Sequence, residues 1–196
     1  MKRIGLFGGM FDPVHLGHLH AAREAAESLS LDKVIFIPAS IPPHKKNGCY
    51  VSGDHRLHML HLALQTDVRF EASAYELEKD GTSYSYLTVE HFKSLFPDDK
   101  LYFLIGDEAY ALLHTWKMPE RIRELAEFVV VTREGTPPPQ DALYIRIPKV
   151  QISSTEVRSA VVEGKNVEHL LPEAVKNYIE KNGLYQGGCY DRKGTT

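Results

Sequence analysis

The sequence predicts a doubly wound α/β fold, in which a mostly parallel sheet carries helices on both faces. Short β-branched and aromatic runs alternate along the chain with segments of helical composition, and this alternation is typical of parallel sheets. Several of the runs are almost entirely apolar, as strands covered on both faces are. The length of 196 residues fits one domain. We therefore expect a single domain over residues 1–185, followed by a flexible tail at 186–196.

The first elements are expected close to the amino terminus. Residues 2–7 (KRIGLF) form a short apolar run that ends in Gly8 and Gly9, a common end for a strand. Residues 16–30 predict a helix, because leucines and alanines recur near one face. Residues 34–39 (VIFIPA) are β-branched and aromatic and predict the second strand, which prolines terminate.

The middle of the chain continues the alternation. Residues 54–65 carry leucines at helical spacing and predict a helix. Residues 68–73 (VRFEAS) suit a strand, and residues 85–95 (SYLTVEHFKSL) suit a helix. Residues 100–106 (KLYFLIG) read as a buried strand that ends in glycine. These segments bring the sheet to four strands.

The last part of the chain adds two further strands. A short helix is expected at 119–126, directly before the β-branched run at 127–133. The proline-rich loop that follows leads to a last strand at 143–148. Helices at 154–163 and 172–182 complete the fold, and an Asn-Gly pair stops the second.

Composition excludes several classes of protein. With 43% hydrophobic and 25% charged residues, the chain is not disordered, and no apolar run approaches the ~20 residues that span a bilayer. The net charge of −3 gives no general attraction to nucleic acids or anionic membranes. Cys49 and Cys189 form neither a disulfide framework nor a zinc finger. The reducing cytosol is therefore the expected compartment, and no signal peptide opens the sequence.

The loop after the first strand, GGMFDPVHLGHL, carries the strongest functional signal. Ligands of such sheets bind at the carboxyl ends of the strands, and Gly8 and Gly9 let the backbone approach a ligand closely. His15 and His18 stand at the start of a helix, whose free N–H groups already favour anions. A helix cap and a half-buried core histidine are the alternative, but the shared position favours phosphate binding.

A metal site is not expected in this loop. Helical zinc pairs are usually spaced i, i+4 with an adjacent Glu, whereas these two histidines are three residues apart. No cysteine stands nearby in the sequence. We therefore expect no metal ligand among the protein side chains.

Two segments add candidates at the same edge of the sheet. His44 and Lys45, followed by Lys46, form a local positive cluster after the second strand, which suits phosphate contact better than a solvated loop. Trp116 is the only tryptophan. It either fills the core or offers a flat platform for a planar ring.

The segment QISSTEVRS predicts a second helix N-terminus with polar side chains. Ser153 and Ser154 are good N-cap residues, and Arg158 follows one turn into the helix. Arginine suits phosphate because its guanidinium donates in a planar fork. Together with the histidine pair, this helix start could surround a polyphosphate. The sequence contains neither a P-loop motif nor the dinucleotide fingerprint G-x-G-x-x-G.

The ordered set of motifs resembles bacterial nicotinate-nucleotide adenylyltransferases, members of the nucleotidyltransferase superfamily with H-x-G-H and I-S-S-T-x-x-R signatures. The resemblance extends over about residues 2–185. Its motifs are GGMFDPVHLGH, IPPHK (41–45), HRLHML (55–60), SYSYLT (83–88), Trp116, VVVTREG (129–135), ISSTEVR and YIEKNGLY (178–185).

The resemblance implies a Rossmann-like fold and a reaction in NAD biosynthesis. AMP would pass from ATP to nicotinate mononucleotide, giving nicotinate adenine dinucleotide and pyrophosphate, with Mg²⁺ held mainly by the substrate phosphates. His15, His18 and Arg158 would act in catalysis. The implied ATP-binding residues are Gly8, Gly9, Phe11, His15, His18, Gly106, Arg133, Ser153, Ser154 and Arg158. The implied pyridine mononucleotide residues are His44, Lys45, Ser85, Tyr86 and Trp116.

Two alternatives stay open at this point. A pantetheine-phosphate adenylyltransferase shares both signatures but does not explain Trp116, IPPHK or SYSYLT. A nucleotide-binding module without catalysis could use the same loops. Partners are expected to be ATP and nicotinate mononucleotide, with no nucleic acid and no membrane, and a homodimer is possible. The preference for nicotinate over nicotinamide mononucleotide is not readable from the residue types.

Overall fold

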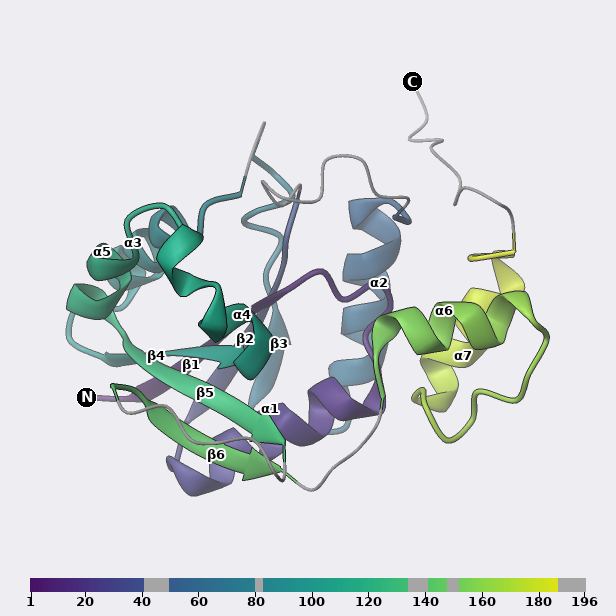
Figure 1. The fold of residues 1–196 in the computed structure, drawn as a ribbon, viewed down its shortest axis with the longest axis horizontal. Helices are drawn as coiled ribbons and strands as arrows, with labels where there is room; N and C mark the ends of the chain where they lie inside the picture. Colours follow the sequence, from purple (N-terminus) through teal and green to yellow (C-terminus); the bar gives the residue numbers. More distant parts are fainter. Residues whose placement is uncertain (41–49, 80–82, 134–140, 148–151, 187–196) are drawn as a thin grey trace.

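A computed structural model describes residues 1–40, 50–79, 83–133, 141–147 and 152–186 of the chain (Figure 1). In these residues six strands form one sheet in the order β3-β2-β1-β4-β5-β6, and every neighbouring pair is parallel. This confirms the predicted α/β class. The strands are β1 (Arg3–Gly9), β2 (Lys33–Pro38), β3 (Phe70–Ala72), β4 (Lys100–Gly106), β5 (Glu127–Arg133) and β6 (Leu143–Ile147).

The helices fall close to their predicted ranges. Two short elements after β4, the helix α4 (Asp107–Ala111) and the 3₁₀ turn η1 (Leu113–Thr115), were not predicted. Five and three residues are too few to show a helical period. The other helices are α1 (Leu16–Ser28), α2 (Gly53–Leu64), α3 (Ser85–Leu95), α5 (Pro119–Leu125), α6 (Ser154–Val162) and α7 (Glu173–Lys181).

The sheet separates two apolar cores, as the doubly wound class requires. Side chains alternate between the faces along each strand. In β1, Phe7 packs into the core that α1, α2, α6 and α7 cover. Its neighbour Leu6 packs into the other core, under α3 and α5. The same alternation in β4 sends Tyr102 to the first core and Phe103 to the second.

The strand order reverses beside β1, and this places a crevice at its carboxyl end. Strands β2 and β3 lie on one side of β1, and β4, β5 and β6 lie on the other. Phe7 of β1 is in register with Phe36 of β2 and with Leu104 of β4. Chain segments that leave β1 and β4 therefore start side by side. In such sheets this is where ligands bind.

The turn that follows β1 depends on a glycine. Phe11 has a left-handed φ of 48°, and its ring folds back over the end of the strand. A Cβ at Gly9 would lie 3.0 Å from Cζ of Phe11. Only glycine leaves room for this packing. The aromatic ring therefore closes the strand and directs the chain toward α1.

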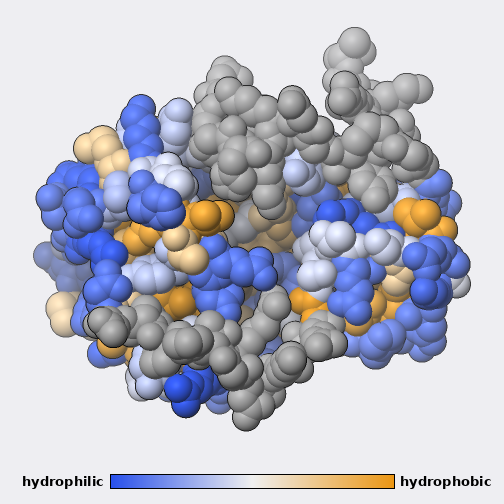
Figure 2. All heavy atoms as spheres, viewed as in Figure 1, coloured by the Kyte–Doolittle hydropathy of each residue, from blue (hydrophilic) through white to orange (hydrophobic). Residues whose placement is uncertain are grey.

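The last two helices form a layer at one side of the sheet. Figure 1 shows α6 and α7 together, next to α2. The space-filling view of the same face is mostly hydrophilic and shows separate small apolar areas (Figure 2). Among the described helices, none has the combined length and apolarity needed to cross a membrane.

Candidate active site

The two predicted histidines form a stacked pair at the start of α1. His15 is the N-cap residue, with extended backbone, and His18 is the third residue of the helix. Their ring centroids are 3.7 Å apart and the ring planes differ by 24°. His15 is buried and His18 is half-buried. One arrangement therefore allows His15 to cap the helix and leaves both histidines in position to bind phosphate.

The hydrogen bond between the pair assigns the tautomer of His18. The backbone N–H of His15 donates to Nδ1 of His18 at 3.3 Å, so Nδ1 carries no proton and Nε2 does. Burial, together with the neighbouring His15, lowers the pKa of His18 well below its ordinary value. At neutral pH, His18 is therefore an uncharged ring with an N–H donor at Nε2.

Gly17 explains why a glycine separates the two histidines. A Cβ at this position would lie 3.1 Å from Nδ1 and 3.2 Å from Cε1 of His15. Such contacts are too close for a rigid ring that is already stacked on His18. The H-x-G-H spacing is thus a packing requirement of the histidine pair. Phe11 supports the other side of the pair, with its ring centroid 5.0 Å from that of His18.

A second helix N-terminus is fastened to the same turn. Ser153 is the N-cap of α6, and its hydroxyl accepts the N–H of Glu156. Ser154 donates its hydroxyl to the carbonyl of Pro13 at 3.0 Å. Arg158 donates from Nη1 to the carbonyl of Asp12 at 2.7 Å. Residues more than 140 positions apart therefore meet at the Asp12-Pro13 turn, just upstream of His15.

The Arg158 guanidinium keeps donors for a ligand. Its Nη2 donates to the hydroxyl of Thr155 at 3.2 Å, and Nη1 is used as described above. A guanidinium has five N–H groups, so these two bonds leave further donors. The side chain is half-buried, which leaves part of it accessible from solvent.

A second group of predicted residues gathers at the start of α3. Ser85 and Tyr86 are the first two residues of this helix. The Lys117 ammonium lies 4.6 Å from the ring centroid of Tyr84, directly before them. This contact brings the segment with Trp116 to the same place. The half-buried Trp116 ring meets Phe103 of β4 edge to face, at 6.1 Å between centroids.

The predicted glycines differ in their surroundings. A Cβ at Gly8 would be 3.8 Å from Cζ of Phe103, an ordinary contact. Gly106 is exposed at the end of β4, and a Cβ there would meet no atom within 4 Å. A ligand can therefore approach the backbone closely at Gly106. Arg133 ends β5, and only its backbone is described.

Two predicted pyridine residues, His44 and Lys45, lie outside the described residues. The residues that are described form two groups. His15, His18, Ser154 and Arg158 gather at the turn after β1, whereas Ser85, Tyr86 and Trp116 gather around the start of α3. Both groups border the point where the strand order reverses.

A buried charged network beneath the histidines was not predicted. The Asp12 carboxylate is 1% exposed and accepts the hydroxyl of Tyr185 at 2.8 Å and the N–H of Val51 at 3.4 Å. Burial raises the pKa of Asp12, while the Tyr185 hydrogen bond and the charges of Arg158 and Arg56 act to lower it. The sequence suggested only a turn at Asp12-Pro13, and a charged residue buried by distant segments gives no local signal.

Arg56, from the HRLHML motif, is the cation of this network. Its guanidinium donates to the carbonyls of Met10, Ala39 and Val51 at 2.9, 2.8 and 3.3 Å. Burial lowers its pKa, and the charge of Asp12 acts in the opposite direction. Arg56 therefore ties together the turn after β1, the end of β2 and the approach to α2.

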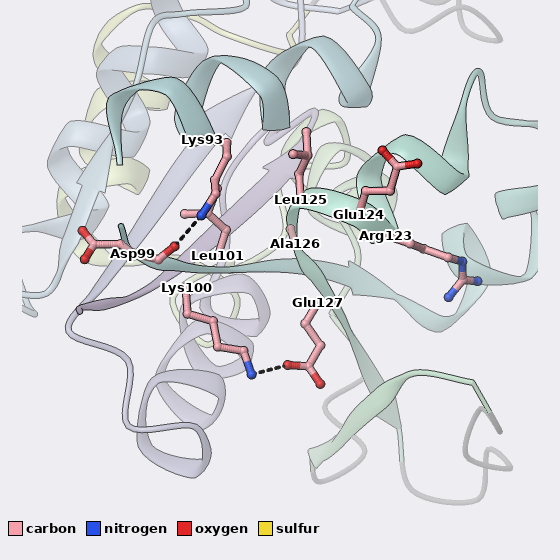
Figure 3. Close-up of a pocket in the computed structure, with 9 residues that line it drawn as sticks. All are labelled: Lys93, Asp99, Lys100, Leu101, Arg123, Glu124, Leu125, Ala126 and Glu127. Atoms are coloured by element: carbon pink, nitrogen blue, oxygen red, sulfur yellow. Dashed lines mark hydrogen bonds and ion pairs between the residues drawn. The ribbon is translucent and has the colours of Figure 1, made fainter. Parts of the chain in front are cut away.

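A hollow of about 360 Å³ lies at the opposite edge of the sheet (Figure 3). Its lining includes the first residues of two strands, Lys100 of β4 and Glu127 of β5. The Lys100 ammonium and the Glu127 carboxylate form an ion pair, with Nζ 2.7 Å from Oε2. Lys93 donates to the carbonyl of Asp99 at 2.9 Å. Since ligands of parallel sheets bind at the carboxyl ends of the strands, this hollow is not the candidate site.

Curated relatives are similar to this chain over most of its length. The model of the cytidylyltransferase-like family matches residues 6–160. A Thermus thermophilus protein named probable nicotinate-nucleotide adenylyltransferase is 46% identical over 187 residues, which are 94% of this chain and 100% of that protein. The Bacillus subtilis nicotinate-nucleotide adenylyltransferase is 39% identical over 188 residues, with 95% and 100% coverage.

The fold has a counterpart among solved structures. Plasmodium falciparum nicotinic acid mononucleotide adenylyltransferase complexed with NaAD is similar with a TM-score of 0.79, covering 98% of this chain and 100% of that one. The sequence identity is 17%. This likeness supports the fold, and the functional assignment depends on the closer sequence relatives.

Proposed function

The chain belongs to the nicotinate-nucleotide adenylyltransferase family, and we propose that it transfers AMP from ATP to nicotinate mononucleotide, releasing pyrophosphate. One observation carries the assignment of the site. Two helix N-termini, those of α1 and α6, meet at one turn, because Ser154 and Arg158 donate to the carbonyls of Pro13 and Asp12, just upstream of His15. Helix N-termini bind phosphate oxygens through free N–H groups and the helix dipole.

The chemistry requires placement of charge more than proton transfer. A phosphate oxygen of the mononucleotide attacks the α-phosphorus of ATP, a new P–O bond forms, and the bond to the β-phosphate oxygen breaks. The second pKa of a phosphate monoester is about 6, so the nucleophile is already anionic at neutral pH. Catalysis therefore consists mainly of positioning and of stabilising negative charge.

His18 is suited to donate to the α-phosphate. Its Nε2–H is free of the His15 N–H bond, which ends on Nδ1, and is a neutral donor. His15 stacks on it and holds its orientation. Arg158 has guanidinium N–H groups beyond those bonded to Asp12 and Thr155, and these would donate to the leaving pyrophosphate.

Mg²⁺ would accompany ATP rather than occupy a cage of protein ligands. Among the described residues, no three His, Cys, Asp or Glu side chains gather as metal ligands. The nearest buried carboxylate, Asp12, is engaged with Tyr185 and Val51. Triphosphate oxygens are themselves good ligands for Mg²⁺, and the bound ion would neutralise part of their charge.

The start of α3 would receive the mononucleotide. Ser85 and Tyr86 are the first residues of this helix. The backbone N–H groups at a helix N-terminus favour binding of a carboxylate. The Trp116 ring lies nearby and would stack on the pyridine. A carboxylate-binding helix start is the feature that supports nicotinate over nicotinamide.

The proposal is tested by measuring pyrophosphate release with MgATP and each of three acceptors. These are nicotinate mononucleotide, nicotinamide mononucleotide and phosphopantetheine. Fast release with the nicotinate form alone is expected. Equal rates with both pyridine nucleotides would refute the role of the α3 helix start, and release with phosphopantetheine alone would refute the proposed acceptor. Release with none of the three would leave nucleotide binding without this reaction.

A further inference from the structure

Tyr185 joins the end of the described chain to the turn before the histidines. It follows α7, is 1% exposed, and has a left-handed φ of 67°. Its hydroxyl donates to Oδ1 of Asp12 at 2.8 Å across 173 residues of sequence. The proposed reaction assigns no contact with substrate to this hydroxyl.

Several hydrogen bonds tie the same turn to the C-terminal part of the described chain. Besides the Tyr185 bond, Arg158 donates to the Asp12 carbonyl and Ser154 to the Pro13 carbonyl. The N–H of Leu16 donates to the carbonyl of Leu170 at 2.9 Å. These bonds hold the start of α6 against the start of α1. The two helix starts are the two sides of the proposed phosphate site.

Of these bonds, only that of Tyr185 ends on the carboxylate of Asp12, whose Oδ1 also accepts the N–H of Val51. The other oxygen of this carboxylate, Oδ2, is buried and has no hydrogen-bond partner among the described residues. A buried carboxylate that lacks part of its hydrogen bonding destabilises a fold compared with a well-packed apolar pair. Stability alone therefore does not account for this arrangement, whereas fixing one geometry of the turn does.

We propose that Tyr185 is a positioning residue, which holds the Asp12 turn so that the histidine pair and Arg158 face the same phosphate. The inference depends on the proposed function for its kinetic readout. Asp12 stands three residues before His15, and the His15 N–H directs the ring of His18. A shift of the turn therefore moves the Nε2–H donor and the start of α6 relative to each other. Misplacement by about 1 Å lowers rates up to about 10²-fold.

The test compares Tyr185→Phe with the matched variant Tyr178→Phe. Tyr178 lies on α7 and its hydroxyl is 2.8 Å from Nδ1 of His55, so its loss also removes one tertiary hydrogen bond, away from the turn. Tyr185→Phe is expected to lower kcat about tenfold or more, whereas Tyr178→Phe leaves kcat within about twofold, at a temperature where both are folded. Equal losses of kcat in both variants, or a kcat of Tyr185→Phe within twofold of wild type, would overturn the proposal.

A second readout does not depend on the reaction. The amides of His15, Leu16, His18 and Leu19 are all hydrogen-bonded around the turn, so their hydrogen exchange reports its opening. Exchange at these amides should be faster in Tyr185→Phe and unchanged in Tyr178→Phe. Unchanged exchange in both variants would refute the positioning role, whether or not the wild-type protein is active. A wild-type protein that releases no pyrophosphate would refute the proposed function, and the exchange measurement would still test the positioning role.

If Tyr185→Phe does not fold, Asp12→Asn replaces it in both measurements. The asparagine keeps an oxygen that can accept from the Tyr185 hydroxyl, but as a weaker, uncharged acceptor. It should therefore show a lower kcat and faster amide exchange at the turn than wild type. Wild-type values for both quantities in this variant would overturn the proposal.

Discussion

Replacing His18 by asparagine should separate its capping contact at the start of α1 from its proposed role as a donor to the α-phosphate. The ring accepts the N–H of His15 at Nδ1 and presents an N–H at Nε2. An asparagine places its amide oxygen close to the position of Nδ1 but has no group at the position of Nε2. The helix start should therefore stay capped while the donor toward the α-phosphate is lost.

The expected magnitudes differ enough to be measured separately. A cap hydrogen bond contributes about 1 kcal/mol to stability, so His18→Asn should keep a Tm near that of wild type. Loss of one donor to the transition state lowers kcat by about 10²–10³, or about 3–4 kcal/mol. His18→Ala should show the same loss of kcat together with a lower Tm. His18→Gln, whose amide N–H reaches toward the Nε2 position, should recover part of the rate.

The assay is pyrophosphate release at saturating substrates, with thermal unfolding measured on the same samples. His20→Asn is the matched control, because His20 lies on the same helix, is half-buried, and faces Glu24 at 4.0 Å. It should change kcat by less than about twofold. The reasoning is wrong if His18→Asn keeps more than a third of the wild-type kcat, or if its Tm falls as far as that of His18→Ala.

Three further predictions concern the same site. Gly17→Ala should lower kcat about tenfold, because its Cβ would lie 3.1 Å from Nδ1 of His15. Its Tm should not fall, because alanine favours a helix over glycine by about 1 kcal/mol. An unchanged kcat would contradict the packing argument. Trp116→Ala should raise KM for the pyridine nucleotide about tenfold, the size of one aromatic stack, and KM for ATP less; equal increases in both constants would exclude stacking. Burial raises the pKa of Asp12 above 3.8, so the folded protein binds a proton at this carboxyl group more tightly than the unfolded chain does. The contribution of Asp12 to the free energy of unfolding therefore falls as pH rises through that pKa. The Tm of Asp12→Asn minus that of wild type should therefore increase between pH 4 and pH 7. Thermal unfolding of both proteins over this range measures this difference, and a decrease with pH would refute the argument.

The fold was predictable because its signals are local. Runs such as VIFIPA and KLYFLIG are apolar enough to be strands buried on both faces, and they are strands in the structure. The order of strands does not follow from such signals, since it depends on contacts between distant segments. Elements as short as α4 also gave no period to detect.

Part of the site was predictable for a similar reason. His15 and His18 are close in sequence, and a helix start brings them together without help from the rest of the chain. The sequence also predicted the start of α6 at Ser154. It could not show that the serine hydroxyl donates to Pro13, because that bond joins residues 141 positions apart.

The buried network explains why the remaining residues escaped prediction. Arg56 is 3% exposed, and its hydrogen bonds reach the carbonyls of Met10 and Ala39, which are 46 and 17 positions away. Nothing in the letters HRLHML distinguishes such an arginine from an exposed one on a helix. A buried guanidinium is tolerated only where acceptors and negative charge converge on it, and here Asp12 supplies the charge. The residues that hold the histidine turn in place are thus recognisable only after the chain has folded, whereas the residues proposed to bind the phosphates stand together in short motifs.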